Sequence, residues 1–158
     1  MKLPIPTHLQ NILIPIGESN SEREVTGKIR CTCGGEAFAL RESNGRQLVN
    51  AVCKACGREH LLFDQGKHGW DGFVCGADFL NREQPLQPYP CPECKKESFG
   101  IVMRISSEGE QDFAEELLSH DGSFAREDWV NAFAWITVSL SCEECGHTDS
   151  EWLDLETM

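Results

Sequence analysis

Residues 31–57, with the sequence CTCGGEAFALRESNGRQLVNAVCKACG, decide the fold because they hold two short cysteine pairs on either side of a hairpin. The pairs are Cys31-Thr32-Cys33 and Cys53-Lys54-Ala55-Cys56. A tight cysteine pair forms a turn, here called a knuckle, that points two thiolates at one metal ion. Two knuckles complete a tetrahedral four-cysteine zinc site. Gly34 and Gly57 directly follow the knuckles, and glycine permits the positive φ that such turns need.

Two further knuckles lie in the second half of the chain, at Cys91-Pro92-Glu93-Cys94 and Cys142-Glu143-Glu144-Cys145. They belong to an internal repeat, because residues 33–38 align with residues 94–99 and residues 53–57 align with residues 142–146. The repeat predicts one site formed by Cys31, Cys33, Cys53 and Cys56 and another formed by Cys91, Cys94, Cys142 and Cys145. Since all eight ligands are cysteines, pairing across the two halves remains an alternative.

Alternating apolar residues predict three strands in each half. In the first half they span residues 36–41, 47–52 and 60–63, and Asn44-Gly45 is a strong two-residue hairpin signal between the first two. In the second half they span residues 98–105, 133–140 and 148–155. The gap between knuckles grows from 19 residues in the first half to 47 in the second. The extra length is an acidic insertion, within which residues 111–119 have the spacing of an amphipathic helix.

Each half, with its knuckles and its Cys-x-x-Glu-x-Phe segment, resembles a zinc ribbon, and the chain resembles a tandem of two ribbons. We therefore expect a mainly β protein with a short α-helical insertion. It would contain two small antiparallel zinc-ribbon sheets related by the internal repeat, with two structural zinc ions. The one-residue spacer of Cys31-Thr32-Cys33 departs from the usual two-residue spacer. Zinc ribbons serve nucleic-acid binding, protein binding and scaffolding alike, so the resemblance indicates metal and fold but not function.

The repeat divides the chain into four parts. Residues 1–27 are expected to be a leader that packs on the body, or alternatively a peptide-like arm that docks on a partner. Residues 28–65 form the first ribbon, and residues 66–90, rich in glycine and proline, form a linker. Residues 91–158 form the second ribbon, with the acidic helical insertion at residues 106–129.

Nine cysteines in 158 residues are also compatible with a disulfide framework or with redox-active pairs. The apolar start of the chain is broken by Pro4, Pro6 and Pro15, unlike a signal peptide, and no stretch reaches transmembrane length. We therefore expect a cytoplasmic protein, with no membrane contact, whose reduced thiols bind zinc. Cys75, the ninth cysteine, is expected to be a small buried apolar residue.

The formal net charge of −12 is unevenly distributed. Residues 1–74 carry nine basic and eight acidic residues, whereas residues 75–158 carry five basic and eighteen acidic residues, so the net charges are +1 and −13. Such a second half repels phosphate backbones and attracts basic surfaces. The expected partner is therefore a basic protein, bound by Glu115 and Glu116 on a surface rimmed by Phe113, Trp129 and Trp152.

In charge and size, the chain resembles bacterial immunity proteins and other inhibitors of basic toxins or nucleases. The alternative function is nucleic-acid binding by the first ribbon. Arg41 and Arg46 flank the Asn44-Gly45 turn, and Lys54 and Arg58 lie at the second knuckle. Four cations make few phosphate contacts, and the rest of the chain opposes them.

Catalytic motifs do not emerge from the sequence. Four sulfurs close each predicted zinc site, whereas a catalytic zinc keeps an open coordination position. Paired carboxylates such as Glu115-Glu116 and Glu127-Asp128 are typical of solvated helix faces. We therefore expect that the protein is not an enzyme.

Overall fold

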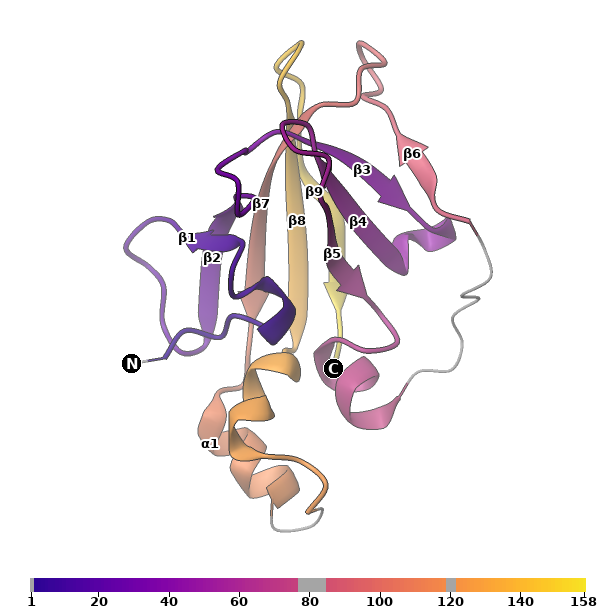
Figure 1. Ribbon diagram of the computed structural model, residues 1–158. Helices are drawn as coiled ribbons and strands as arrows, with labels where there is room; N and C mark the ends of the chain where they lie inside the picture. The colour runs from indigo at the N-terminus through magenta and orange to yellow at the C-terminus, as the bar shows by residue number, and fades with distance from the viewer. Residues whose placement is uncertain (1, 77–84, 119–121) are drawn as a thin grey trace.

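The computed structural model of the chain describes residues 2–76, 85–118 and 122–158. Within these residues, nine strands form one antiparallel sheet (Figure 1). The strands are β1 (Leu13–Pro15), β2 (Glu24–Ile29), β3 (Phe38–Glu42), β4 (Leu48–Cys53), β5 (Glu59–Asp64), β6 (Gln87–Tyr89), β7 (Phe99–Ser106), β8 (Trp135–Cys142) and β9 (Thr148–Glu156). The expectation of a mainly β, antiparallel fold is confirmed.

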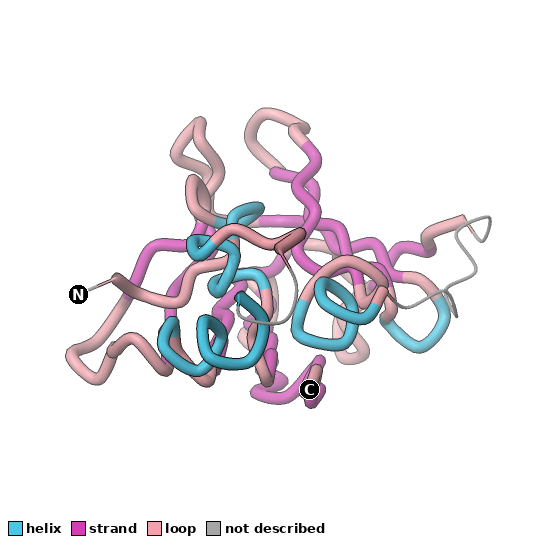
Figure 2. The backbone as a smooth tube through the Cα atoms, turned by 90° about the horizontal axis from the view of Figure 1, so that it is seen from below, coloured by secondary structure: helices cyan, strands magenta, loops and turns pink. Residues whose placement is uncertain are grey.

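The helical segments are short. They are η1 (Thr7–Leu9), η2 (Asn44–Arg46), η3 (Trp70–Cys75), α1 (Glu110–Phe113), η4 (Ala114–Leu118) and η5 (Arg126–Asn131). The segments η3, α1, η4 and η5 lie at one end of the sheet, opposite the cysteine knuckles, and Figure 2 shows them in cyan from below. Among the described residues, no helix is long and apolar enough to cross a membrane.

All six predicted strands are present, as β3, β4 and β5 in the first half and β7, β8 and β9 in the second. Their registers show the same internal repeat that the sequence shows. Phe38 of β3 pairs with Cys53 of β4, and the equivalent Phe99 of β7 pairs with Cys142 of β8. In each half, this pairing brings the segment after the first knuckle against the start of the second knuckle.

The two ribbons do not form separate sheets. Phe38 pairs directly with Phe99, and this single pair joins β3 to β7. Because equivalent residues of the two halves are paired antiparallel, the halves are related there by a local two-fold axis. Beyond this pair, β2 takes the place of β3 at the same edge of β7. Residues 24–28 of β2 pair there with residues 102–106 of β7.

The leader packs on the body through Leu9, Ile12 and Leu13, which are buried in the main core. It also contributes β1 and β2, neither of which the sequence pattern predicted. Strand β2 crosses the expected boundary at residue 27 and pairs with β7 of the second half. The leader therefore extends the second ribbon's sheet.

The linker also contains regular structure. Strand β6 pairs with β3, with Leu40 opposite Tyr89. The connection between β3 and β4 is longer than the predicted two-residue turn. It is closed by Ser43 and Leu48: the Ser43 N–H donates to the Leu48 carbonyl, and the Leu48 N–H donates to the Ser43 hydroxyl. Gly45 and Arg46 both have positive φ in this connection, at 73° and 55°.

The insertion is helical over residues 110–118, close to the predicted helix at residues 111–119, whose end at residue 119 lies outside the described residues. A small second core, formed by Phe113, Trp129, Val130 and Ala132, packs the insertion against η3. The sequence pattern did not predict η5, which begins where the Asp128 carboxylate accepts the Ala125 backbone N–H at 2.8 Å.

Candidate metal centres

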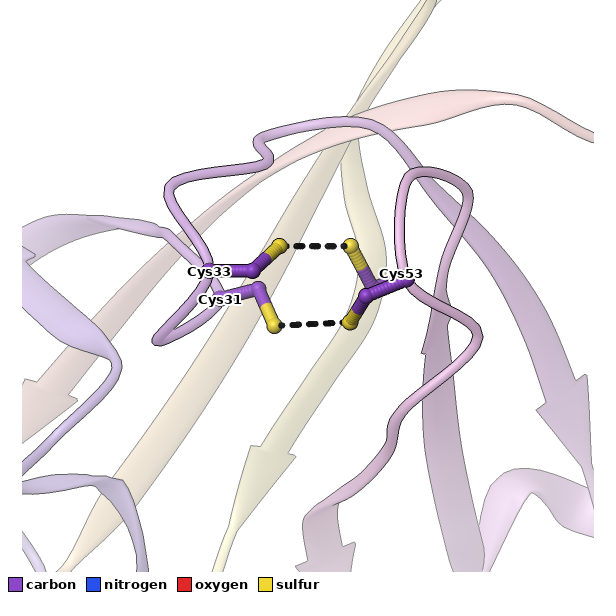
Figure 3. A group of neighbouring side chains, drawn as sticks. Cys31, Cys33 and Cys53 are labelled. Atoms are coloured by element: carbon purple, nitrogen blue, oxygen red, sulfur yellow. Dashed lines mark hydrogen bonds between the residues drawn. The ribbon is translucent and has the colours of Figure 1, made fainter.

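The first candidate metal centre lies between the knuckle before β3 and the knuckle after β4. The Sγ atoms of Cys31, Cys33, Cys53 and Cys56 all lie within 4.8 Å of one another. The Sγ atoms of Cys31 and Cys56 lie 3.6 Å apart, as do those of Cys33 and Cys53. Figure 3, in which Cys31, Cys33 and Cys53 are labelled, shows the sulfurs in two facing pairs. Zn–S bonds of about 2.3 Å place tetrahedral sulfurs about 3.8 Å apart. The cluster therefore has the dimensions of a four-thiolate metal site.

Backbone geometry explains how the unusual one-residue spacer reaches the site. The Cys31 N–H donates to the Gly35 carbonyl at 2.8 Å, and the Gly34 N–H donates to the Cys31 carbonyl at the same distance. Gly34 has a φ of 96°, which glycine adopts readily. A Cβ on Gly35 would lie 2.8 Å from Cys53 Sγ, so only glycine leaves room for the facing sulfur.

The second candidate metal centre repeats this geometry. The Sγ atoms of Cys91, Cys94, Cys142 and Cys145 lie within 4.8 Å of one another. The facing pairs are Cys91 to Cys145 and Cys94 to Cys142, each at 3.6 Å. The structure thus groups all eight predicted ligands as the repeat predicted, within each half and not across the halves.

Each cluster has a buried side and a solvent side. Cys31, Cys53, Cys91 and Cys142 are buried, whereas Cys33, Cys56 and Cys145 are exposed and Cys94 is half-buried. Four sulfurs surround each centre. This arrangement suits a metal that stabilises the fold, because it leaves no open coordination position for a substrate.

The electrostatics of the first cluster favour a cation. The backbone N–H of Cys33 lowers the pKa of Cys31 to about 5, and His60 contributes in the same direction against the effect of burial. The backbone N–H of Gly35 lowers the pKa of Cys33, but the neighbouring cysteines outweigh it and raise this pKa to about 11. Cys31 therefore ionises easily while Cys33 resists ionisation, and a metal dication bound by the cluster would favour the thiolate form.

The second cluster shows the same division. Backbone N–H groups, first that of Cys145, lower the pKa of Cys142 to about 7. For Cys145, the backbone N–H of His147 lowers the pKa, but burial and the other three cysteines raise it to about 12. The two clusters are thus alike in chemistry as well as in geometry.

His60 is a site residue that the sequence analysis missed. Its Nε2 lies 3.2 Å from Cys31 Sγ, and its ring lies edge-on to Phe38. His60 follows Cys56 by four residues, and the equivalent position after Cys145 is Asp149. Comparing the two halves of the repeat could have drawn attention to this difference.

The predicted acidic residues lie at the other end of the molecule. Glu115 and Glu116 of η4 line a cleft of about 390 Å³ together with Glu108, Asp112, Trp70 and Met158. Glu115 Oε1 accepts a hydrogen bond from Gln111 Nε2 at 2.9 Å. The two predicted partner-binding carboxylates therefore belong to one acidic concave surface.

The aromatic residues predicted to rim this surface do not do so. Phe113, Trp129 and Trp152 are each only 2% exposed. Phe113 of α1 and Trp129 of η5 pack together in the second core, and Trp152 of β9 lies in the main core. Cys75 was expected to be buried but is exposed, since it is the last residue of η3.

The two arginines of the nucleic-acid alternative differ in their surroundings. Arg41 is exposed. Arg46 Nε forms an ion pair with Glu42 at 2.7 Å, and its Nη1 donates to the Trp152 carbonyl. Its guanidinium also lies 4.2 Å from the centre of the Trp152 ring and 5.5 Å from that of Tyr89. Arg46 thus joins the tip of the first ribbon to β9 and is not free to bind phosphate.

These features define the class as a β protein with two four-cysteine clusters that can hold metal ions. Comparisons of the chain with protein-family models, curated proteins and solved structures found no match.

Proposed function

We propose that the protein is non-enzymatic, that both clusters bind zinc as structural sites, and that it acts as an acidic interaction module for a basic protein. The observation that carries this proposal is a spatial separation. The knuckles lie at one end of the sheet, and α1 and η4, which contribute residues to the acidic cleft, lie at the other (Figure 1). The metal sites stabilise the sheet, and the far end is left for binding.

Zinc is the metal that the donor set favours. Four thiolates in a tetrahedral arrangement select zinc or iron–sulfur chemistry among the common metals. The sulfur separations of 3.6 Å suit a single zinc ion. Structural zinc supplies on the order of 10 kcal/mol of folding free energy, which stabilises small sheets of this kind.

A basic partner is favoured by the charges at the cleft. Among the described residues that line it, all the charged ones are carboxylates: Glu108, Asp112, Glu115 and Glu116. Met158 lines the same cleft and is 46% exposed, so apolar contact accompanies the charge. Complementary charge speeds association and selects partners. A narrower form of this proposal is an inhibitor or immunity-type protein that neutralises a basic toxin or nuclease.

The test is capture of partners from an extract of the native cells, at low and high salt and after nuclease treatment. The bait is the zinc-loaded chain, compared with the double variant Glu115→Lys/Glu116→Lys. We expect a basic protein that survives nuclease treatment, is released by salt and is lost with the double variant. The matched control is Glu18→Lys/Glu22→Lys, which makes the same charge change at exposed positions of the leader.

If the double variant and the control capture the same proteins equally well, the acidic cleft is not the binding surface. Recovery of nucleic acid in place of a protein would favour the alternative function, for which Arg41, Lys54 and Arg58 are exposed.

A further inference from the structure

A second cleft, of about 500 Å³, lies where η1, η3, η5 and the loop after β5 meet. Its described lining residues are Thr7, His8, Gly66, Lys67, His68, Gly72, Phe73 and Asn131. Its volume is within the usual range of small-molecule pockets. Neither the metal clusters nor the acidic cleft shares any of these residues.

The walls of this cleft are held by specific hydrogen bonds. The Asn131 side chain bonds to Thr7 twice, accepting its backbone N–H at 2.9 Å and donating to its hydroxyl at 3.1 Å. Asp64 accepts the backbone N–H of both Lys67 and His68 at its carbonyl, and that of Gly66 at its carboxylate. The cleft is therefore largely preformed.

Two stacked histidines form part of the wall. The rings of His8 and His68 are parallel within 2°, with centroids 3.7 Å apart. His8 Nε2 lies 2.9 Å from the Leu62 carbonyl, which can only accept, so Nε2 carries a proton. His68 Nδ1 accepts the Asp64 backbone N–H at 2.9 Å, so Nδ1 carries none.

These contacts determine what the remaining ring nitrogens can do when both rings are neutral. His8 Nδ1 is then an acceptor and His68 Nε2–H is a donor. Neither nitrogen has a hydrogen-bond partner within the described part of the chain. Burial lowers the pKa of His8, and burial followed by the proximity of His8 lowers the pKa of His68 to about 3, so both rings are neutral at pH 7.

Charge and apolar surface complete the description. Lys67 is the sole charged side chain among the described residues lining the cleft, although the chain as a whole carries −12. The Asp64 carboxylate does not line the cleft. Phe73 is half-buried and offers an aromatic surface beside the polar groups.

We propose that this cleft binds a small planar heterocyclic carboxylate with an amide or imide edge. His8 Nδ1 accepts from the ligand N–H, and His68 Nε2–H donates to the neighbouring carbonyl oxygen. Lys67 pairs with the carboxylate, and Phe73 contacts the face of the ring. The proposal is independent of the proposed protein-binding function, because the two surfaces share no residue.

The test uses orotate as the probe, because its pyrimidine ring combines an imide edge with a carboxylate. Zinc-loaded full chain is titrated while the imidazole nitrogens are followed by ¹⁵N NMR. We expect free protein to show both histidines neutral with the proton on Nε2, and orotate to shift His8 Nδ1 and His68 Nε2. Uracil lacks the carboxylate and benzoate lacks the imide edge, so each should bind at least about five-fold more weakly.

The variant Lys67→Gln removes the cation at an exposed position and should weaken orotate binding by about two- to five-fold. Lys2→Gln, which removes an exposed lysine that does not line the cleft, is the matched control and should leave binding unchanged. The proposal is overturned if millimolar orotate does not shift the two histidines, or if uracil or benzoate binds as well as orotate.

Discussion

Replacing Arg46 with alanine should destabilise the protein far more than replacing Arg41. The two arginines flank the Asn44-Gly45 turn, and both were candidates for binding nucleic acid. The guanidinium of Arg46 makes an ion pair with Glu42, a hydrogen bond to the Trp152 carbonyl and a close cation–π contact with the Trp152 ring. In general, the hydrogen bond from a charged donor contributes about 1.5–3 kcal/mol, the cation–π contact about 1–2 and a half-exposed ion pair below about 1. Because one guanidinium makes all three contacts, they are not additive, and we expect a net loss of about 2–4 kcal/mol.

The measurement is urea unfolding of the zinc-loaded, reduced protein, followed by tryptophan fluorescence. A loss of this size corresponds to a fall in Tm of roughly 5–15 °C for a domain of this length. Arg41→Ala should change stability by less than about 0.5 kcal/mol, because Arg41 is exposed. Arg46→Lys should recover part of the loss. If Arg46→Ala is as stable as Arg41→Ala, the contact between the ribbon tip and β9 does not contribute as described.

Three further predictions concern individual residues. Gly35→Ala should weaken metal binding at the first centre about ten-fold or more, measured by competition with a chelator, because its Cβ would lie 2.8 Å from Cys53 Sγ. Gly122→Ala, which has open space around it, is the control and should bind metal normally. His60→Ala should speed release of metal from the first centre only, since its Nε2 lies 3.2 Å from Cys31 Sγ; equal release from both centres in this variant would contradict that role. The free energy of unfolding should fall as pH decreases below 6.5, by about 1.4 kcal/mol per pH unit from His68, because the unfolded chain takes up this proton near 6.5 and the folded chain only near 3. His68→Gln should reduce this pH dependence in urea unfolding, and an unchanged slope would show that His68 is not the group responsible.

The strands and the two cysteine clusters could be predicted because both are local patterns. Alternation along six segments identified six strands, and knuckle spacing identified all eight sulfurs. The repeat also predicted the ligand pairing, since Phe38 and Phe99 occupy the same register position in their halves.

The joining of the two ribbons into one sheet was not predictable in this way. It depends on the pairing of Phe38 with Phe99 and of β2 with β7, and both are contacts between segments distant in sequence. Strand β2 contains Gly27 and Lys28, so its apolar alternation is weak. A Cβ on Gly27 would lie 2.7 Å from the Ile14 carbonyl, which shows that tertiary packing determines this residue.

The functional residues were harder to predict because exposure is a property of the folded chain. Phe113 and Trp129 were expected on a binding surface, but the insertion uses them as its own core. Arg46 was expected to be free for phosphate, but it stacks on Trp152, more than a hundred residues away in sequence. Glu115 and Glu116, with nearby carboxylates, keep the surface position expected of them, as does Arg41.

We propose that each four-cysteine cluster holds one structural zinc ion, and metal analysis of the protein is the decisive test. Protein purified under reducing conditions from native cells would be weighed by native mass spectrometry, and its metals identified by elemental analysis. We expect two zinc ions per chain, one for each cluster, with one lost in Cys53→Ser and the other lost in Cys142→Ser. Folded wild-type protein that contains no bound metal would contradict it.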